Sequence, residues 1–208
     1  MNRYVLDPCV PDEAIVEEAA AVLRHGGIVA YPTETVYGLA VDPRSDIAVR
    51  RLFALKQRDA ASPIALIAAD STQAEEAGTF GPFERRLAEA LWPGPLTIVV
   101  PASQRMSRHL SAGNCTLGVR VPGHAVARAL ARAFGGCITA TSANLSGRPA
   151  ASTGAEVARS LEGRIDLLID AGPVPGGPAS TIVEVIDGVP TPHRVGAVAW
   201  ERVLESFE

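Results

Sequence analysis

Lys56 is the only lysine among the 19 lysine and arginine residues of the chain, and it lies two positions before Arg58. Lysine carries a compact ammonium on a flexible stem, whereas arginine presents a planar fork that can hold two oxygens of a phosphate or carboxylate. The two types together are typical of phosphate binding, so the pair indicates an anion site. The alternative is one surface lysine left in an arginine-rich chain, and other segments have to decide between the two.

Three further segments place polar groups where folding alone does not require them. Residues 31–39 bring hydroxyls, a carboxylate and two tyrosines directly after an apolar run. Arg120 lies within the apolar run 117–121, where a buried charge needs a partner. Residues 141–148 follow another apolar run with hydroxyl and amide groups, at a position where open α/β sheets bind ligands. A polar strand end, a core ion pair at Arg120 and a plain Ser/Gly loop stay open as alternatives.

Several common motifs are absent from the sequence. There is no Gly-x-Gly-x-x-Gly, no phosphate-binding Gly-x-x-x-x-Gly-Lys-Ser/Thr and no Gly-x-Ser-x-Gly. The three cysteines are odd in number and form no Cys-x-x-Cys pair, and the four histidines lack metal-ligand spacing. We therefore expect neither a disulfide framework nor a protein-held metal site. The segments favour handling of an anion or nucleotide by positioning and charge, without a covalent nucleophile.

The composition sets broad limits on what the protein can be. Of 208 residues, 47% are hydrophobic and 20% are charged, which is typical of a folded globular chain rather than a disordered one. The net charge of −4 argues against a dedicated nucleic-acid binder, although one basic cleft remains compatible with it. No apolar run approaches the ~20 residues of a membrane span, so we expect a cytoplasmic protein with no membrane partner.

The hydrophobic periodicity alternates between helical and strand-like segments. It predicts one α/β domain over residues 1–208, with a mixed sheet and flanking helices. A hairpin is expected around the turn Asp187-Gly188. Predicted helices cover about 12–25, about 46–56, a short stretch after Asp70, a segment that Gly81-Pro82 opens and Pro93-Gly94 stops, about 125–134 and about 154–161. Predicted strands cover 28–31, 64–68, 96–100, 117–121, 138–140, 167–169 and 182–186.

At these segments the chain closely resembles the YrdC/TsaC family of L-threonylcarbamoyladenylate synthases. Seven motifs occur in family order and cover nearly the whole chain. They are Tyr-Pro-Thr-Glu-Thr-Val-Tyr-Gly-Leu at 31–39, Lys56-x-Arg58 with Pro63, Leu-Trp-Pro-Gly-Pro-Leu-Thr at 91–97, Val-Arg-Val-Pro at 119–122, Thr-Ser-Ala-Asn-Leu-Ser-Gly at 141–147, Ser-Thr-Ile-Val at 180–183 and Arg194-x-Gly196.

The resemblance implies a twisted mixed sheet curved around a positively lined concave cavity, as in the short, single-domain bacterial members. It also implies a nucleotidyltransferase that makes threonylcarbamoyl-AMP and pyrophosphate from L-threonine, bicarbonate and ATP, with Mg²⁺ accompanying ATP. The product would feed N6-threonylcarbamoyladenosine modification of tRNA through downstream threonylcarbamoyl-transfer proteins.

The family pattern further implies roles for individual residues. Lys56 and Arg58 would be catalytic. The residues expected to hold L-threonine are Thr33, Arg120 and Ser180, and those expected to hold ATP are Lys56, Arg58, Thr116, Ser142, Asn144, Arg148 and Arg194. Two positions depart from the family: Asp59 stands where proline is usual, and Ile67 stands where some members carry a threonine-contacting histidine.

Two alternatives compete with the synthase. The first is an RNA-binding YrdC-like module, since a concave basic cavity suits a polyanion; the acidic net charge counts against it and leaves weak RNA binding as an added expectation. The second is a YciO-like paralogue with altered chemistry. The intact motifs at 92–95 and 141–144 favour the synthase over this paralogue.

Overall fold

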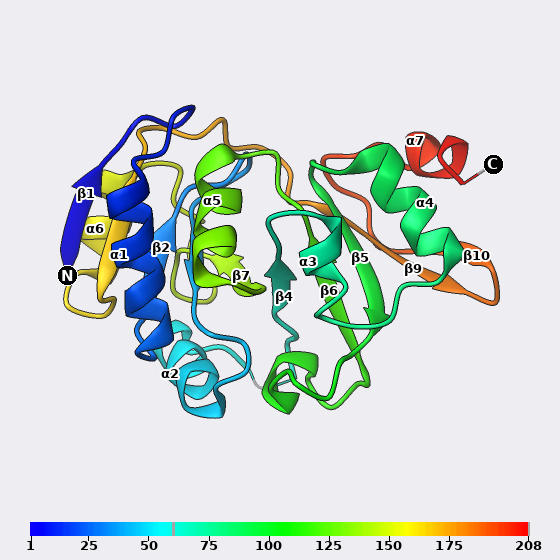
Figure 1. Cartoon of the computed structure of the whole chain (residues 1–208), viewed down its shortest axis with the longest axis horizontal. Helices are drawn as coiled ribbons and strands as arrows, with labels where there is room; N and C mark the ends of the chain where they lie inside the picture. The colour runs from blue at the N-terminus through cyan, green and yellow to red at the C-terminus, as the bar shows by residue number, and fades with distance from the viewer. Residues whose placement is uncertain (60, 208) are drawn as a thin grey trace.

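A computed structural model describes residues 1–59 and 61–207, and within them ten strands form one mixed sheet (Figure 1). The strand order is β1-β8-β2-β3-β7-β4-β6-β5-β9-β10, with parallel pairs β1/β8, β8/β2, β4/β6 and β5/β9 and antiparallel pairs elsewhere. The strands are β1 (Asn2–Val5), β2 (Val29–Tyr31), β3 (Gly38–Ala40), β4 (Ala65–Ile67), β5 (Leu96–Pro101), β6 (Thr116–Arg120), β7 (Ile138–Ser142), β8 (Leu167–Asp170), β9 (Thr181–Ile186) and β10 (Val189–Arg194).

Helices cover the sheet on both sides. In Figure 1, α1 and α5 lie side by side over one face, and they pack against each other. The helices are α1 (Glu13–Arg24), α2 (Asp46–Lys56), α3 (Ser71–Ala74), α4 (Pro82–Leu91), the 3₁₀ turn η1 (Arg108–Ser111), α5 (Ala125–Phe134), α6 (Gly154–Leu161) and α7 (Trp200–Glu205). The predicted mixed α/β architecture is therefore confirmed.

Alternation along β8 shows why the sheet needs both layers. Leu167 and Ile169 point to the cluster that contains the buried faces of α1 and α5, whereas Leu168 between them joins the cluster on the opposite face. Successive side chains of a strand point to opposite faces, so an uninterrupted apolar run must be covered on both sides. The run at 167–169 was readable as a buried strand for this reason.

The helix boundaries follow from local capping. Asp12 accepts hydrogen bonds from the first turn of α1, Ser45 caps α2, and Thr153 with Glu156 forms a complete capping box at the start of α6. The turn Asp187-Gly188 joins β9 to β10, and both residues have positive φ angles, as a two-residue hairpin turn requires. The predicted Ser45 cap, the Thr153/Glu156 capping box and the hairpin turn are confirmed, and the first helix is one residue shorter at each end than predicted.

Four elements were not predicted from the sequence: β1, β3, η1 and α7. The exposure pattern of β1 is nearly all outward, so it carries no alternating apolar signal, and only its pairing with β8 makes it a strand. Strand β3 begins at the end of the polar segment 31–39 and ends at Ala40. It forms because β2 and β7 pair with it on either side. Tertiary pairing thus overrides weak local preference.

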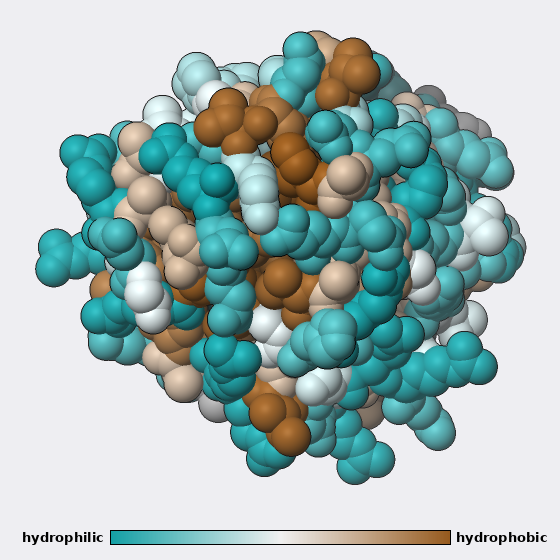
Figure 2. Space-filling view, turned by 60° about the vertical axis from the view of Figure 1, so that its left-hand side comes forward, coloured by the Kyte–Doolittle hydropathy of each residue, from teal (hydrophilic) through white to brown (hydrophobic). Residues whose placement is uncertain are grey.

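The outer surface is largely hydrophilic. Figure 2 shows apolar side chains on one face interspersed with hydrophilic ones. Exposed large apolar residues are dispersed over several elements and include Val5, Val10, Ile47 and Val189. Across the described residues, every helix is too short or too polar to cross a membrane.

Candidate functional site

A cavity of about 580 Å³ lies over the central strands and is walled by segments far apart in the sequence. The loop after β2, the ends of β6 and β7, and the hairpin β9–β10 all contribute to its wall. It brings together six of the predicted site residues, namely Thr33, Arg58, Arg120, Ser142, Ser180 and Arg194. Among the described residues its charged lining consists of three arginines and no carboxylate. The cavity therefore attracts anions.

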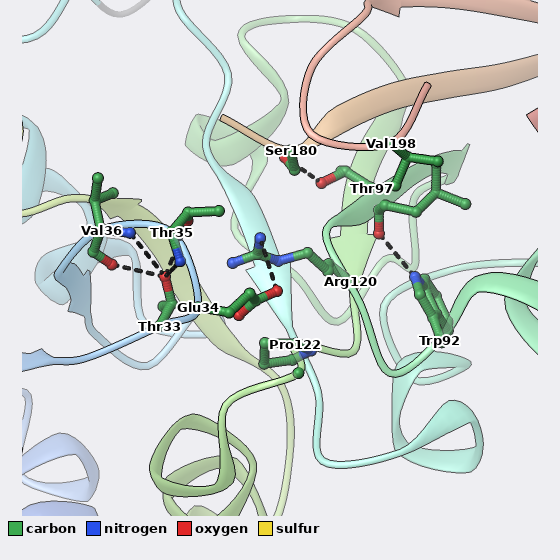
Figure 3. A network of polar contacts seen from close by, with 12 residues as sticks. Thr33, Glu34, Thr35, Val36, Trp92, Thr97, Arg120, Pro122, Ser180 and Val198 are labelled. Atoms are coloured by element: carbon green, nitrogen blue, oxygen red, sulfur yellow. Dashed lines mark hydrogen bonds and ion pairs between the residues drawn. The ribbon is translucent and has the colours of Figure 1, made fainter. Parts of the chain in front are cut away.

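The loop that follows β2 is organised by the hydroxyl of Thr33, which is 3% exposed (Figure 3). This hydroxyl donates to the carbonyl of Val36 at 2.6 Å and accepts from the backbone N–H groups of Thr35 and Val36 at 3.2 and 3.3 Å. The hydroxyl of Thr35 lies 3.1 Å away. Thr33 thus closes a tight turn that turns Thr35 towards the cavity, in addition to forming part of the wall itself.

Arg120, at the end of β6, faces the carboxylate of Glu34 from the same loop (Figure 3). Its Nη1 lies 3.4 Å from Glu34 Oε1, and the side chain of Arg120 is 9% exposed. Both carboxylate oxygens of Glu34 are buried and have no hydrogen-bond partner in the described part of the protein. Arg120 thus forms the ion pair that the sequence left as one alternative, and it also lines the cavity. Sequence reasoning noted a carboxylate in this segment but did not pair it with Arg120.

Ser180 and Arg194 form one corner of the cavity. Arg194 donates through Nε and Nη2 to the carbonyl of Ser180 at 3.0 and 2.9 Å, and through Nη2 to its hydroxyl at 3.2 Å. The Ser180 hydroxyl also lies 2.9 Å from that of Thr97 (Figure 3). Gly196 is needed nearby, because a Cβ there would lie 2.0 Å from the carbonyl of Ala179. Burial, and repulsion from Arg120, lower the pKa of Arg194. Both guanidiniums line the same cavity.

Lys56 lies beneath the cavity rather than on its wall. It is 1% exposed, and its Nζ donates to the carbonyl of Ser142, to the carbonyl of Asn144 at 2.9 Å and to Asn144 Oδ1 at 3.1 Å. The carbonyl of Lys56 in turn accepts from the backbone of Ser146 at 2.9 Å. Burial and the neighbouring Arg58 lower the pKa of Lys56 to about 8. The single lysine of the chain thus holds the loop after β7 in place.

Arg58 reaches the cavity from the segment after α2. Its Nε donates to the carbonyl of Ser62 at 3.1 Å and its Nη2 to that of Pro63 at 2.9 Å. Burial lowers its pKa. Asp59 stands where the family that this chain resembles usually has proline. Its carboxylate accepts a hydrogen bond from the backbone N–H of Ala61 at 2.9 Å. The local turn thus has its own side-chain contact at this position. The guanidinium is held by carbonyl oxygens, and among the described residues it forms no ion pair that would compensate its charge.

The remaining predicted residues lie outside this cavity. Asn144 and Arg148 line a neighbouring hollow of about 500 Å³, and Ala150 borders both spaces. The Asn144 side chain donates to the carbonyl of Arg148, so the two residues hold one loop together. Thr116 begins β6, four residues before Arg120, and lines neither hollow. Ile67, which stands where some members of the family that the chain resembles carry a histidine, is fully buried in β4.

The cysteines and the acidic residues offer little for covalent or metal chemistry. In the described residues no group of three or more His, Cys, Asp or Glu side chains is arranged to hold a metal ion. Cys9 and Cys115 are exposed, while Cys137 is buried and donates to the carbonyl of Gln73 at 3.3 Å. Burial raises the pKa of Cys137 to about 12, so its nucleophilic thiolate form is absent at neutral pH.

We therefore expect the variant Cys9→Ser, Cys115→Ser, Cys137→Ala to keep any activity within about threefold of the unmodified protein, since no cysteine is among the described residues that line the cavity. Turnover should be measured at equal concentrations of folded protein, because truncating the buried Cys137 lowers stability. A loss of turnover when Cys9 or Cys115 is alkylated, with an unchanged circular dichroism spectrum, would contradict this prediction.

Comparisons with known proteins place these features in a family. The family model for Sua5, YciO and YrdC, described as telomere recombination, matches residues 21–196. A threonylcarbamoyl-AMP synthase of Halorhodospira halophila is 51% identical over 157 residues, which are 74% of this chain and 81% of that protein. The structure of P. abyssi Sua5 complexed with L-threonine matches 99% of this chain with a TM-score of 0.91 at 34% identity, and the chain spans 60% of its length. E. coli YciO matches over the full length of both chains, with a TM-score of 0.88 at 25% identity.

Proposed function

The chain belongs to the Sua5/YciO/YrdC family, as its seven motifs predicted, and from this premise we propose that it is a threonylcarbamoyl-AMP synthase. Its substrates are L-threonine, bicarbonate and ATP, and its products are threonylcarbamoyl-AMP and pyrophosphate. The threonylcarbamoyl-AMP synthases among its relatives support this activity over a separate RNA-binding role. The product then serves N6-threonylcarbamoyladenosine modification of tRNA through downstream transfer proteins.

One observation carries the proposal: three arginines and a set of hydroxyls from distant segments converge on a single cavity. None of the described residues that line this cavity carries a carboxylate. L-threonine carries a carboxylate, ATP carries phosphates and bicarbonate is itself an anion, so such a cavity suits all three substrates. Arg120, with Thr33 and Ser180 nearby, takes the threonine carboxylate. Arg58 and Arg194 take the phosphates of ATP, and Ser142 forms the wall beside them.

The chemistry requires positioning and charge rather than a protein nucleophile. The threonine amine combines with bicarbonate to give a carbamate and water. A carbamate oxygen then attacks the α-phosphorus of ATP as the bond from that phosphorus to the bridging oxygen breaks, and pyrophosphate leaves with the bonding electrons. The guanidiniums of Arg58 and Arg194 stabilise the charge that develops on the leaving group. Asn144 and Arg148 line the adjoining hollow, so in this scheme the ribose and base of ATP lie there and contact these two residues. Thr116 lines neither space and has no contact with ATP in the scheme.

Mg²⁺ belongs to this proposal only as an ion carried by ATP. The described side chains do not fit a protein-held metal site, because the cavity wall offers guanidinium and hydroxyl groups rather than carboxylates. Magnesium bound to the phosphates of ATP would lower the charge that the arginines have to neutralise. Lys56 donates to the loop of Ser142 and Asn144, and in this scheme we assign it to positioning that loop.

The purified protein should release pyrophosphate when L-threonine, bicarbonate, ATP and Mg²⁺ are supplied together, and release should require each of the first three. Added tRNA should change the rate by less than about twofold, since a chain of net charge −4 must find any RNA affinity in a local patch that salt weakens. Pyrophosphate formation is followed by a coupled assay, and threonylcarbamoyl-AMP by mass spectrometry.

Two outcomes would separate the alternatives. Release that appears only with tRNA would favour the RNA-binding module. Adenylation that does not depend on threonine would instead favour a YciO-like paralogue with altered chemistry, which the full-length likeness to E. coli YciO makes the relevant comparison.

A further inference from the structure

Glu34 has an unusual environment for a carboxylate. Both of its oxygens are buried, and neither has a hydrogen-bond partner among the described residues. Its charged neighbour is Arg120, at 3.4 Å, a distance that gives attraction without a short hydrogen bond. A buried carboxylate without hydrogen bonds is costly and is found where another constraint maintains it. Figure 3 shows Glu34 lying between the Thr33 turn and Arg120.

The three cavity arginines therefore differ in their charge environment. Arg120 forms an ion pair with Glu34. Arg58 and Arg194 contact carbonyl and hydroxyl oxygens, and neither forms an ion pair in the part of the chain that the structure describes. The charge of Arg120 is thus balanced by a carboxylate, whereas the charges of Arg58 and Arg194 are not.

We propose that Glu34 is a specificity-determining residue that reserves Arg120 for the carboxylate of the amino acid and keeps phosphate groups away from it. The proposal rests on the proposed function and deepens it. Arg120 has five N–H donors, and an ion pair on one side leaves others to hold a ligand carboxylate through paired hydrogen bonds. A triphosphate or pyrophosphate depends more on net charge, which Glu34 cancels at this end.

This arrangement solves a problem that a uniformly positive cavity would have. ATP and pyrophosphate carry several negative charges, whereas the carboxylate of threonine carries one, so unpaired arginines would favour phosphate at every position. Phosphate bound at Arg120 would exclude threonine. With Glu34 in place, the polyanion is directed to Arg58 and Arg194 and the amino acid binds at Arg120.

The test is whether inorganic pyrophosphate displaces threonine. L-threonine binding is measured by isothermal titration calorimetry with increasing pyrophosphate, for the unmodified protein and for Glu34→Gln, which removes the charge and keeps the shape. Pyrophosphate should leave threonine affinity unchanged in the unmodified protein. In Glu34→Gln pyrophosphate should compete with threonine. Its inhibition constant against threonine binding should be at least about tenfold lower than in the unmodified protein, as expected when a charge a few ångströms away is removed.

Two variants serve as controls. Glu34→Asp retains the charge and should retain the discrimination. Glu75→Gln breaks the exposed pair of Glu75 with Arg85 and should behave as the unmodified protein. Steady-state kinetics give a second readout: pyrophosphate should be competitive with ATP in all proteins and competitive with threonine only in Glu34→Gln. If that variant does not fold by circular dichroism, Glu34→Ser takes its place, since its smaller side chain leaves room for water beside Arg120.

The outcomes distinguish the two proposals. Threonine binding that pyrophosphate affects equally in the unmodified protein and in Glu34→Gln would overturn the role of Glu34 and leave the synthase function intact. Absence of threonine binding and of threonine-dependent pyrophosphate release by the unmodified protein would overturn the proposed function, and the role of Glu34 with it.

Discussion

Replacing Lys56 with alanine is expected to lower kcat/KM by at least about 30-fold, or ~2 kcal/mol, although this lysine does not touch the cavity. Its ammonium is buried and serves three acceptors on Ser142 and Asn144. Removing it leaves the carbonyl of Asn144 without a donor among the described residues, whereas the carbonyl of Ser142 and Asn144 Oδ1 keep the backbone N–H of Asn144 and the Ser142 hydroxyl. We expect a cost in unfolding free energy of roughly 1 to 3 kcal/mol. The loop that carries Ser142 should then lose its position at the cavity wall.

The matched control is Arg50→Ala, which removes an exposed cation from the same helix. Among the described residues, the Arg50 guanidinium donates one hydrogen bond, to the carbonyl of Asp46. Activity is measured by pyrophosphate release, and stability by urea unfolding. Near-normal turnover in Lys56→Ala, with a native circular dichroism spectrum, would show that the loop does not need this lysine. A loss of stability without a loss of turnover in the folded protein would assign Lys56 to folding alone.

Replacing Arg120 with lysine is expected to raise the KM for threonine by roughly 30- to 100-fold, because the change keeps the charge but removes the fork that can hold two carboxylate oxygens. Lysine also loses reach towards Glu34, the buried counter-charge 3.4 Å from Arg120. The KM for ATP should change by less than about threefold, since phosphates bind at other arginines in the proposed scheme.

Arg194→Lys is the reciprocal variant. Arg194 contacts Ser180 and forms no ion pair among the described residues. In the proposed scheme its uncompensated charge takes the phosphates of ATP, so its replacement should weaken the binding of ATP more than that of threonine. KM values for both substrates are measured for each variant under saturating conditions of the other substrate. A larger effect of Arg120→Lys on ATP than on threonine would refute the placement of the amino acid at Arg120.

Much of the secondary structure could be predicted because its signals are local. The apolar runs of β2, β4 and β8, the caps Asp12, Ser45 and Thr153, and the Asp187-Gly188 turn each depend on residues close together in the chain. Six of the predicted site residues line one cavity, and their roles there stay predictions. Their types alone indicated anion chemistry.

The tertiary structure decided how those residues are divided. Lys56 has the residue type of a phosphate ligand, yet it is buried with carbonyl partners from a loop some ninety positions later. Thr116 carries a hydroxyl, but its place at the start of β6 puts it outside the cavity wall. Glu34 and Arg120 meet only because the loop after β2 and the end of β6 converge in the folded sheet. Residue type determines what chemistry is available, whereas pairing between distant strands determines which groups face the ligand and which support them, because burial and counter-charges depend on contacts that no local pattern records.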